Sequence, residues 1–123
     1  MEFKVPKEAY TGVVREVTIG KGDRALKVGG ENILPLHFFD EGSQPNPPRF
    51  ALGILDMEPS DWPPHLVEPF GDAISDPVKW AKRLETFDID AICLTLASTD
   101  PAERDSSPEE AAGLVKRMIG EIK

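Results

Sequence analysis

Two largely apolar runs constrain what this chain of 123 residues can fold into more than any other feature. The first covers residues 50–57 (FALGILDM) and has an acid, Asp56, near its end; the second covers residues 91–97 (AICLTLA). Such runs are typical of parallel strands that are buried on both faces beneath helices. We therefore predict a β-α-β unit with two buried strands, in which Cys93 is a buried and unreactive thiol.

The segment between the two runs carries a clear helix start. Asp76 suits the N-cap, and Pro77 suits the first helical position. Trp80, Leu84 and Phe87 then follow at helical spacing and are expected to face the core.

A further helix begins at a capping-box pattern, in which Ser107 is the N-cap and Glu110 stands three residues later. A shorter helical turn is expected over residues 62–67, with Ser60 or Asp61 as its cap. The apolar positions of the last helix fall on one face, which must pack on something; they are Ala111, Leu114, Val115, Met118 and Ile122.

The N-terminal part alternates in a β-like manner. Residues 10–19 and 24–28 flank a turn at residues 20–23, which predicts a β-hairpin. Residues 33–36 offer a third extended piece, and prolines make residues 38–48 a loop.

Two domains are therefore expected. Residues 1–48 form an N-terminal β-hairpin and a proline-rich loop, and residues 49–123 form two β-α units.

Composition excludes several classes of function. The net charge of −8 repels phosphate backbones and anionic membrane surfaces, so neither nucleic acid nor membrane is an expected partner. Cys93 is the only cysteine, so this chain cannot ligate an iron–sulfur cluster by itself. No signal peptide and no run of about 20 apolar residues is present, which makes the cytoplasm the expected location.

The carboxyl ends of the two predicted strands hold the candidate binding residues, because parallel β/α folds place ligands there. The alternative interpretation is that Asp100 and Pro101 form a turn while Ser98 or Thr99 satisfies nearby backbone groups. The candidates are Asp56, Glu58, Ser98, Thr99 and Asp100.

Other motifs are weaker. The glycines at positions 20, 22, 29 and 30 match neither phosphate-binding pattern and indicate turns. His37 and His65 lie far apart without further ligands at metal-binding spacing, so no metal site is expected.

Several spaced blocks of the sequence belong together. They are residues 29–35 (GGENILP), 45–48 (PNPP), 55–59 (LDMEP), 62–63 (WP), 76–82 (DPVKWAK), 94–101 (LTLASTDP) and 107–112 (SPEEAA). In this order they resemble the small subunit of the corrinoid iron–sulfur protein, the family that includes the delta subunit of the acetyl-CoA decarbonylase/synthase complex. The resemblance runs from about Thr11 to the C-terminus.

The resemblance implies a role in methyl transfer. Family members pair with a large corrinoid iron–sulfur subunit and share a corrinoid with it. The resemblance implies that the corrinoid's cobalt accepts a methyl group from a methylated pterin through a separate methyltransferase. The cobalt then passes the methyl group to acetyl-CoA synthase in the reductive acetyl-CoA (Wood–Ljungdahl) pathway of anaerobes. The five strand-end candidates would face the corrinoid, with Ser98 and Thr99 as hydrogen-bond donors and no residue ligating cobalt.

A complete eight-stranded β/α barrel takes roughly 250 residues. The expected fold class is therefore α/β, an N-terminal β-hairpin followed by the first two β-α units of a TIM-type barrel. Such a chain is not expected to be catalytic alone. The alternatives are a fragment of a pterin-dependent methyltransferase-type barrel and a small stand-alone protein-interaction domain.

Overall fold

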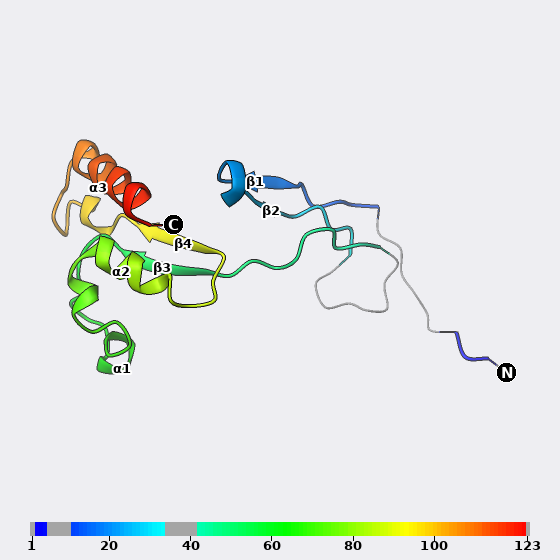
Figure 1. The fold of residues 1–123 in the computed structure, drawn as a ribbon, viewed down its shortest axis with the longest axis horizontal. Coiled ribbons are helices and arrows are strands. Elements are labelled where there is room, and N and C mark those ends of the chain that lie inside the picture. Colours follow the sequence, from blue (N-terminus) through cyan, green and yellow to red (C-terminus); the bar gives the residue numbers. More distant parts are fainter. Residues whose placement is uncertain (1, 5–10, 34–41, 123) are drawn as a thin grey trace. The chain divides into compact units, whose positions relative to one another are not determined.

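The computed structural model describes residues 2–4, 11–33 and 42–122. Contacts divide the chain into two compact units, Met1–Arg49 and Phe50–Lys123, which are described separately (Figure 1). The described residues form a mixed α/β structure with two small sheets and three α-helices. None of these helices combines the length and the apolar character that a membrane-spanning segment requires.

The first unit contains the predicted hairpin. Strand β1 (Val17–Ile19) pairs antiparallel with β2 (Leu26–Val28), so that Val17 lies opposite Val28. A short 3-10 turn at Gly22–Arg24 joins the strands. Gly20 and Gly22 have positive φ angles there, which favour glycine, so their interpretation as turn residues is confirmed.

The proline-rich segment contains no helix or strand over residues 42–48, as predicted. It is held to the hairpin by Asn46, whose side-chain amide donates to the carbonyl of Gly29 at 2.8 Å and to Glu16 Oε2 at 3.0 Å. Lys27 also donates to Glu16, at 3.1 Å. Both hydrogen bonds lower the pKa of the Glu16 carboxyl, and the bond from Asn46 has the larger effect. His37 and most of the predicted extended piece at residues 33–36 lie outside the described residues.

The second unit contains the predicted β-α-β arrangement. Strand β3 (Ala51–Leu55) pairs parallel with β4 (Ala91–Thr95), and α2 (Pro77–Leu84) connects them (Figure 1). Asp76 caps α2 as predicted, because its Oδ1 accepts hydrogen bonds from the backbone N–H groups of Val78 and Lys79. Helix α3 (Pro108–Glu121) follows β4 and begins at the predicted capping box of Ser107 and Glu110.

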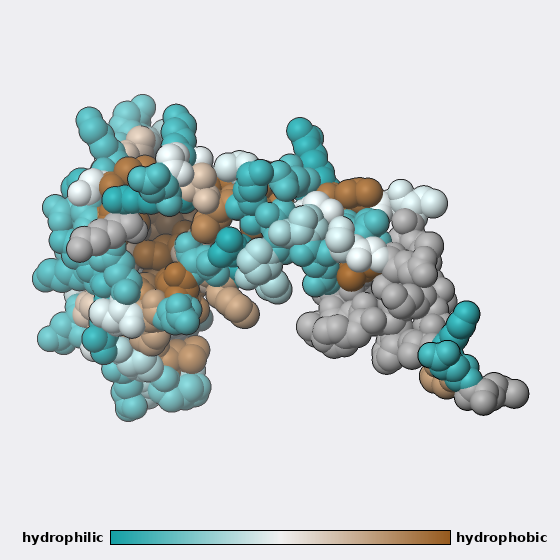
Figure 2. Space-filling model, turned by 45° about the vertical axis from the view of Figure 1, so that its right-hand side comes forward, coloured by the Kyte–Doolittle hydropathy of each residue, from teal (hydrophilic) through white to brown (hydrophobic). Residues whose placement is uncertain are grey.

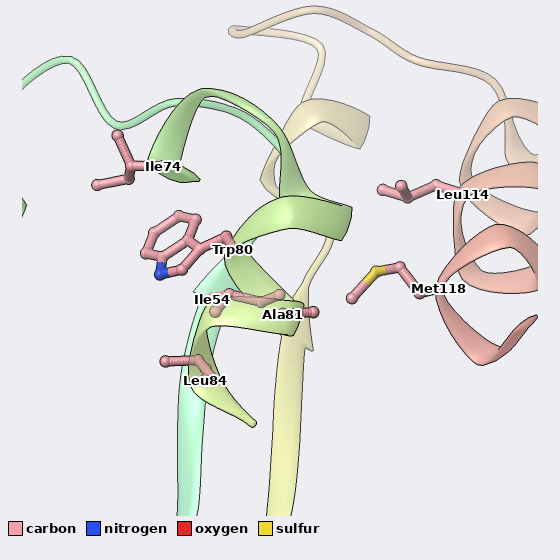
Figure 3. Close-up of a cluster of buried hydrophobic side chains, with 7 residues drawn as sticks. All are labelled: Ile54, Ile74, Trp80, Ala81, Leu84, Leu114 and Met118. Atoms are coloured by element: carbon pink, nitrogen blue, oxygen red, sulfur yellow. The ribbon is translucent and has the colours of Figure 1, made fainter. Parts of the chain in front are cut away.

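The core of this unit centres on Trp80 of α2, which is fully buried. Its ring lies 5.6 Å from that of Trp62 and 5.5 Å from that of Phe70, in edge and tilted arrangements that favour aromatic pairs. Figure 3 shows Leu114 and Met118 of α3 pointing toward α2, which explains why one face of α3 is apolar. The buried cluster comprises Ile54, Ile74, Trp80, Ala81, Leu84, Leu114 and Met118.

Two local helix predictions were wrong. Helix α1 (Pro64–Val67) has Pro63 at its N-cap position, and neither Ser60 nor Asp61 caps it. Helix α2 ends at Leu84, so Phe87 lies in the following turn and is 41% exposed. The prediction included Phe87 because it continues the apolar spacing of the helix, but the backbone leaves the helix after Leu84 and turns toward β4.

The prediction that both strands are buried on both faces was also wrong. Along β3 the core face carries Ile54, which is 1% exposed, whereas Gly53 and its β4 partner Cys93 are exposed. Strand residues alternate between faces, and within the described residues helices cover one face of this sheet. The Cys93 thiol is therefore exposed and not buried as predicted.

Candidate functional site

The parallel register brings the carboxyl ends of β3 and β4 together, with Leu55 opposite Thr95. Asp56 follows β3 directly, and Ser98 lies in the 3-10 turn Ala97–Thr99 after β4. Asp56 Oδ1 accepts from the Ser98 backbone N–H at 2.9 Å, and Oδ2 accepts from the Ser98 hydroxyl at 2.5 Å. Both residues are buried, so one carboxylate satisfies two buried donors.

Backbone bonds extend this connection. The Asp56 N–H donates to the Thr95 carbonyl at 3.1 Å, and the Ser98 carbonyl accepts from the Ser106 N–H at 2.9 Å. The pair of Asp56 and Ser98 therefore links the ends of both strands to the loop that leads into α3. This arrangement positions the strand ends rather than presenting either side chain to a ligand.

Thr99 and Asp100 are also engaged locally. The Thr99 hydroxyl donates to the Leu96 carbonyl at 2.7 Å, and Asp100 Oδ1 accepts from the Ala102 N–H at 2.8 Å. This agrees with the alternative in which Asp100 begins a turn and Thr99 satisfies a backbone group. Because the hydroxyl hydrogens of Ser98 and Thr99 are used within the chain, ligand binding through these donors requires both side chains to reorient.

Glu58, Thr99 and Asp100 do meet in one place. They line a cavity of about 530 Å³, termed the acidic pocket, at the ends of β3 and β4. Asp61 and Glu103 also contribute to its wall, so carboxylates dominate the polar groups. Such a pocket offers hydrogen-bond acceptors and repels anions.

A second cavity, of about 480 Å³, is lined by Asp56, Glu58 and Ser98 together with Arg104 and Arg117. Sequence reasoning missed both arginines. Arg104 stands in the loop after β4 and Arg117 on the third turn of α3, and no spacing rule connects these positions. Only the packing of α3 against the loop brings them to the same cavity.

Metal binding finds no support in the described part of the chain. No group of three or more histidine, cysteine or carboxylate side chains is placed there to hold an ion. His65 lies on α1 and is exposed.

The geometry defines the class of protein. It is an α/β protein with two parallel strands, and at their carboxyl ends the hydrogen-bonded pair of Asp56 and Ser98 lies beside the acidic pocket. Comparison with known families is more specific. Residues 16–123 match the model of the CO dehydrogenase/acetyl-CoA synthase delta subunit, and this chain belongs to that family.

Individual relatives agree with the family match. The chain is 36% identical to the acetyl-CoA decarbonylase/synthase complex subunit delta of Methanocaldococcus jannaschii, over 97% of this chain and 30% of the relative. It is 32% identical to that of Methanothermobacter thermautotrophicus, over 96% and 30%, and 29% identical to that of Archaeoglobus fulgidus, over 99% and 28%. The chain thus spans somewhat less than a third of the relatives' length.

The second cavity and the acidic pocket, of about 480 and 530 Å³, are each large enough to take an amide-bearing side chain of a ligand. Carboxylates such as Glu58 and Asp100 accept hydrogen bonds from amide N–H groups. The chemistry of the acidic pocket therefore suits the rim of a corrin ring.

Proposed function

We propose that this chain contributes to a corrinoid protein that carries methyl groups from a methylated pterin to acetyl-CoA synthase, in the reductive acetyl-CoA pathway. The corrinoid would supply the cobalt that accepts the methyl group. The chain would help to hold the corrinoid and the large corrinoid iron–sulfur subunit. It would act in the cytoplasm and would not be catalytic alone.

Membership of the delta subunit family is the observation that carries this proposal. The relatives are named as subunits of the acetyl-CoA decarbonylase/synthase complex, so a role within such an assembly is the natural extension. The acidic pocket adds local support, because its acceptors suit a neutral, amide-bearing ligand better than an anionic one.

The proposed fold is the beginning of a TIM-type barrel. A parallel β3–α2–β4 unit followed by α3 is the arrangement with which such a barrel would begin. In that fold the carboxyl ends of the strands form the ligand-binding face, where Asp56, Glu58, Ser98, Thr99 and Asp100 are found.

These five residues would have different roles in the site. Asp56 and Ser98 would fix the strand ends as positioning residues, since their side chains bond to each other. Glu58 and Asp100 would accept hydrogen bonds from corrin amides, and Thr99 would add a neutral contact. No residue of this chain would ligate cobalt, and its single cysteine cannot hold the partner's iron–sulfur cluster.

The test is an anaerobic purification of a delta subunit that contains this region, together with its large subunit. We expect stoichiometric corrinoid in the pair, detected by its visible absorbance. A labelled methyl group from a methylated pterin such as methyltetrahydrofolate should reach the pair only when the methyltransferase is added. A pair that lacks corrinoid, or labelled methyl transferred by this subunit alone, would contradict the proposal; the second result would favour a methyltransferase.

A further inference from the structure

Two arginines line a cavity that the roles proposed for the strand ends leave unused. The second cavity of the candidate site has a volume of about 480 Å³ and is termed the arginine cavity, because Arg104 and Arg117 line it. Long side chains on a helix point toward its amino end, so Arg117 of α3 reaches back toward the loop that carries Arg104. Two guanidinium groups from different segments of the chain therefore border one space.

The donors of these two arginines are available to a ligand. Within residues 2–4, 11–33 and 42–122, neither side chain forms a hydrogen bond or an ion pair. Acidic residues outnumber basic ones by fifteen to seven in the second unit, so carboxylates are plentiful around them. Figure 2 shows hydrophilic side chains over much of the visible surface of this unit. Each guanidinium group has five N–H donors, and both residues are exposed.

Three carboxylates also line the arginine cavity, and two of them already accept hydrogen bonds. Both oxygens of Asp56 accept from Ser98. Glu110 Oε2 accepts from the backbone N–H of Ser107 in the capping box. Glu58 is the third acid, and the two arginines outnumber it. The groups of this cavity that remain open to a ligand are therefore mainly cationic donors.

A serine hydroxyl adds a neutral donor to the arginine cavity. Ser106 is half-buried in its wall, and its hydroxyl makes no hydrogen bond within the part of the chain that the structure describes. The hydroxyl of Ser75, in the same wall, is engaged differently and donates to the Asp72 carbonyl at 2.9 Å. Planar guanidinium groups match pairs of phosphate oxygens, and a hydroxyl can donate to a further oxygen. This set of donors suits a phosphate group.

The arginine cavity adjoins the acidic pocket, because Met57 and Glu58 line both. One ligand can therefore place amide groups in the acidic pocket and an anionic group in the arginine cavity. A complete corrinoid carries both kinds of group, since amides surround its ring and a phosphodiester lies in its nucleotide loop.

We propose that Arg104, Arg117 and Ser106 form a binding site for a phosphate group. The group comes from one of two sources, which are the phosphodiester of the corrinoid and a separate phosphorylated small molecule. The first source rests on the proposed function, and the second does not. In both cases the guanidinium groups donate to the charged oxygens of the phosphate.

Phosphate binding by the assembled delta and large subunits tests the site. The corrinoid-free pair is titrated with inorganic phosphate in a calorimeter. The test variant carries both Arg104→Gln and Arg117→Gln. The control variant carries both Lys79→Gln and Arg83→Gln, which remove the same charge from exposed residues of α2 that do not line the cavity. We expect phosphate to bind the test variant at least about tenfold more weakly than the unmodified pair, and the control variant to bind it equally well.

A comparison of two corrinoids identifies the source of the phosphate. Cobalamin has the nucleotide loop and its phosphodiester, whereas cobinamide lacks both. If the corrinoid supplies the phosphate, the preference for cobalamin over cobinamide should fall about tenfold in the test variant, as measured by visible absorbance after gel filtration. An unchanged preference, together with weakened binding of inorganic phosphate, would assign the site to a separate phosphorylated molecule.

Three results would overturn the proposal. They are no binding of inorganic phosphate to the unmodified pair, equal phosphate affinity in the unmodified pair and the test variant, and an equal loss of affinity in the test and control variants. The titration needs no corrinoid, so its outcome is separate from that of the proposed function. The site can fail in a pair that retains corrinoid, and it can hold in a pair that does not.

Discussion

Asp56 and Ser98 stand 42 positions apart in the sequence, yet the Asp56 carboxylate accepts both the backbone N–H and the hydroxyl of Ser98. The two residues follow neighbouring parallel strands, so this contact exists only when β3 and β4 pair in the observed register. A slip of one residue would face the side chains in opposite directions. The pair therefore reports directly on the correct assembly of the β-α-β unit.

Replacing Asp56 should destabilise this unit in a graded manner. Asp56→Ala leaves two buried donors of Ser98 without an acceptor and should lower the free energy of unfolding by about 3 kcal/mol. Asp56→Asn keeps one acceptor, and the Ser98 hydroxyl can rotate to accept from the new amide, so a loss of about 1 kcal/mol is expected. Urea denaturation followed by Trp fluorescence gives both values.

Asp88→Ala serves as the control, because Asp88 is exposed in the link before β4. It should leave the unfolding free energy within about 0.5 kcal/mol of the starting protein. Equal losses for Asp56→Ala and Asp88→Ala would show that the buried pair contributes nothing.

Trp80 should be the most sensitive core position. It is fully buried between Trp62 and Phe70, and Trp80→Ala should cost about 3–5 kcal/mol. Trp80→Phe should cost less than half of that, because it keeps a ring and removes an indole Nε1 that has no hydrogen-bond partner among the described residues. Thermal melts monitored by circular dichroism distinguish the two; a larger loss for Phe than for Ala would contradict this reading.

Gly29 should be irreplaceable in the hairpin unit. Its φ is +82°, and a Cβ atom there would lie 2.3 Å from the carbonyl oxygen of Arg15. Gly29→Ala should destabilise the hairpin by at least about 1–2 kcal/mol. The signature is loss of cross-strand NMR contacts between β1 and β2. Gly12→Ala, where no atom lies within 4 Å of the added Cβ, should keep them.

The ion pair between Lys82 of α2 and Glu121 of α3 should give stability a weak pH dependence. Its hydrogen bond lowers the pKa of Glu121 and raises that of Lys82. A lowered acid pKa means that the stabilisation is present above the ordinary carboxyl pKa of about 4.3 and is lost as the pH falls through the folded value. The raised lysine pKa means that it is also lost at strongly alkaline pH.

Glu121→Gln should therefore lower the melting temperature slightly at pH 7 and leave it unchanged near pH 3. Both side chains are exposed, so the effect is small and should shrink at high salt. A difference from the starting protein that persists undiminished at pH 3 would contradict the assignment to this pair.

Local signals predicted the starts of α2 and α3 and the presence of the hairpin, although they misplaced the cap of α1 and the end of α2. Asp76 with Pro77 and Ser107 with Glu110 satisfy backbone N–H groups within three residues, so their effect does not depend on the rest of the fold. The parallel pairing of β3 and β4 was also predictable, because a helix between two apolar runs allows few other connections.

Features that depend on contacts distant in sequence were missed. Cys93 lies in an apolar run, but the face it occupies is uncovered among the described residues. The bond between Ser98 and Asp56, and the meeting of Arg104 with Arg117 at one cavity, arise from tertiary packing alone. The sequence predicted that the strand ends form the candidate site. It did not predict which side chains there are already hydrogen-bonded to other groups of the chain.

The central claim is that the strand ends of this chain contact a corrinoid, and its most direct test is corrinoid retention by the assembled delta and large subunits. The measurement is the visible corrin absorbance per complex after gel filtration. The test variant carries both Glu58→Gln and Asp100→Asn. The control variant carries both Asp72→Asn and Asp88→Asn. The control residues are exposed and do not line the acidic pocket. We expect the first pair to weaken retention about tenfold, through two lost or weakened hydrogen bonds, and the control to match the unmodified complex. Equal retention in all three complexes would contradict the account.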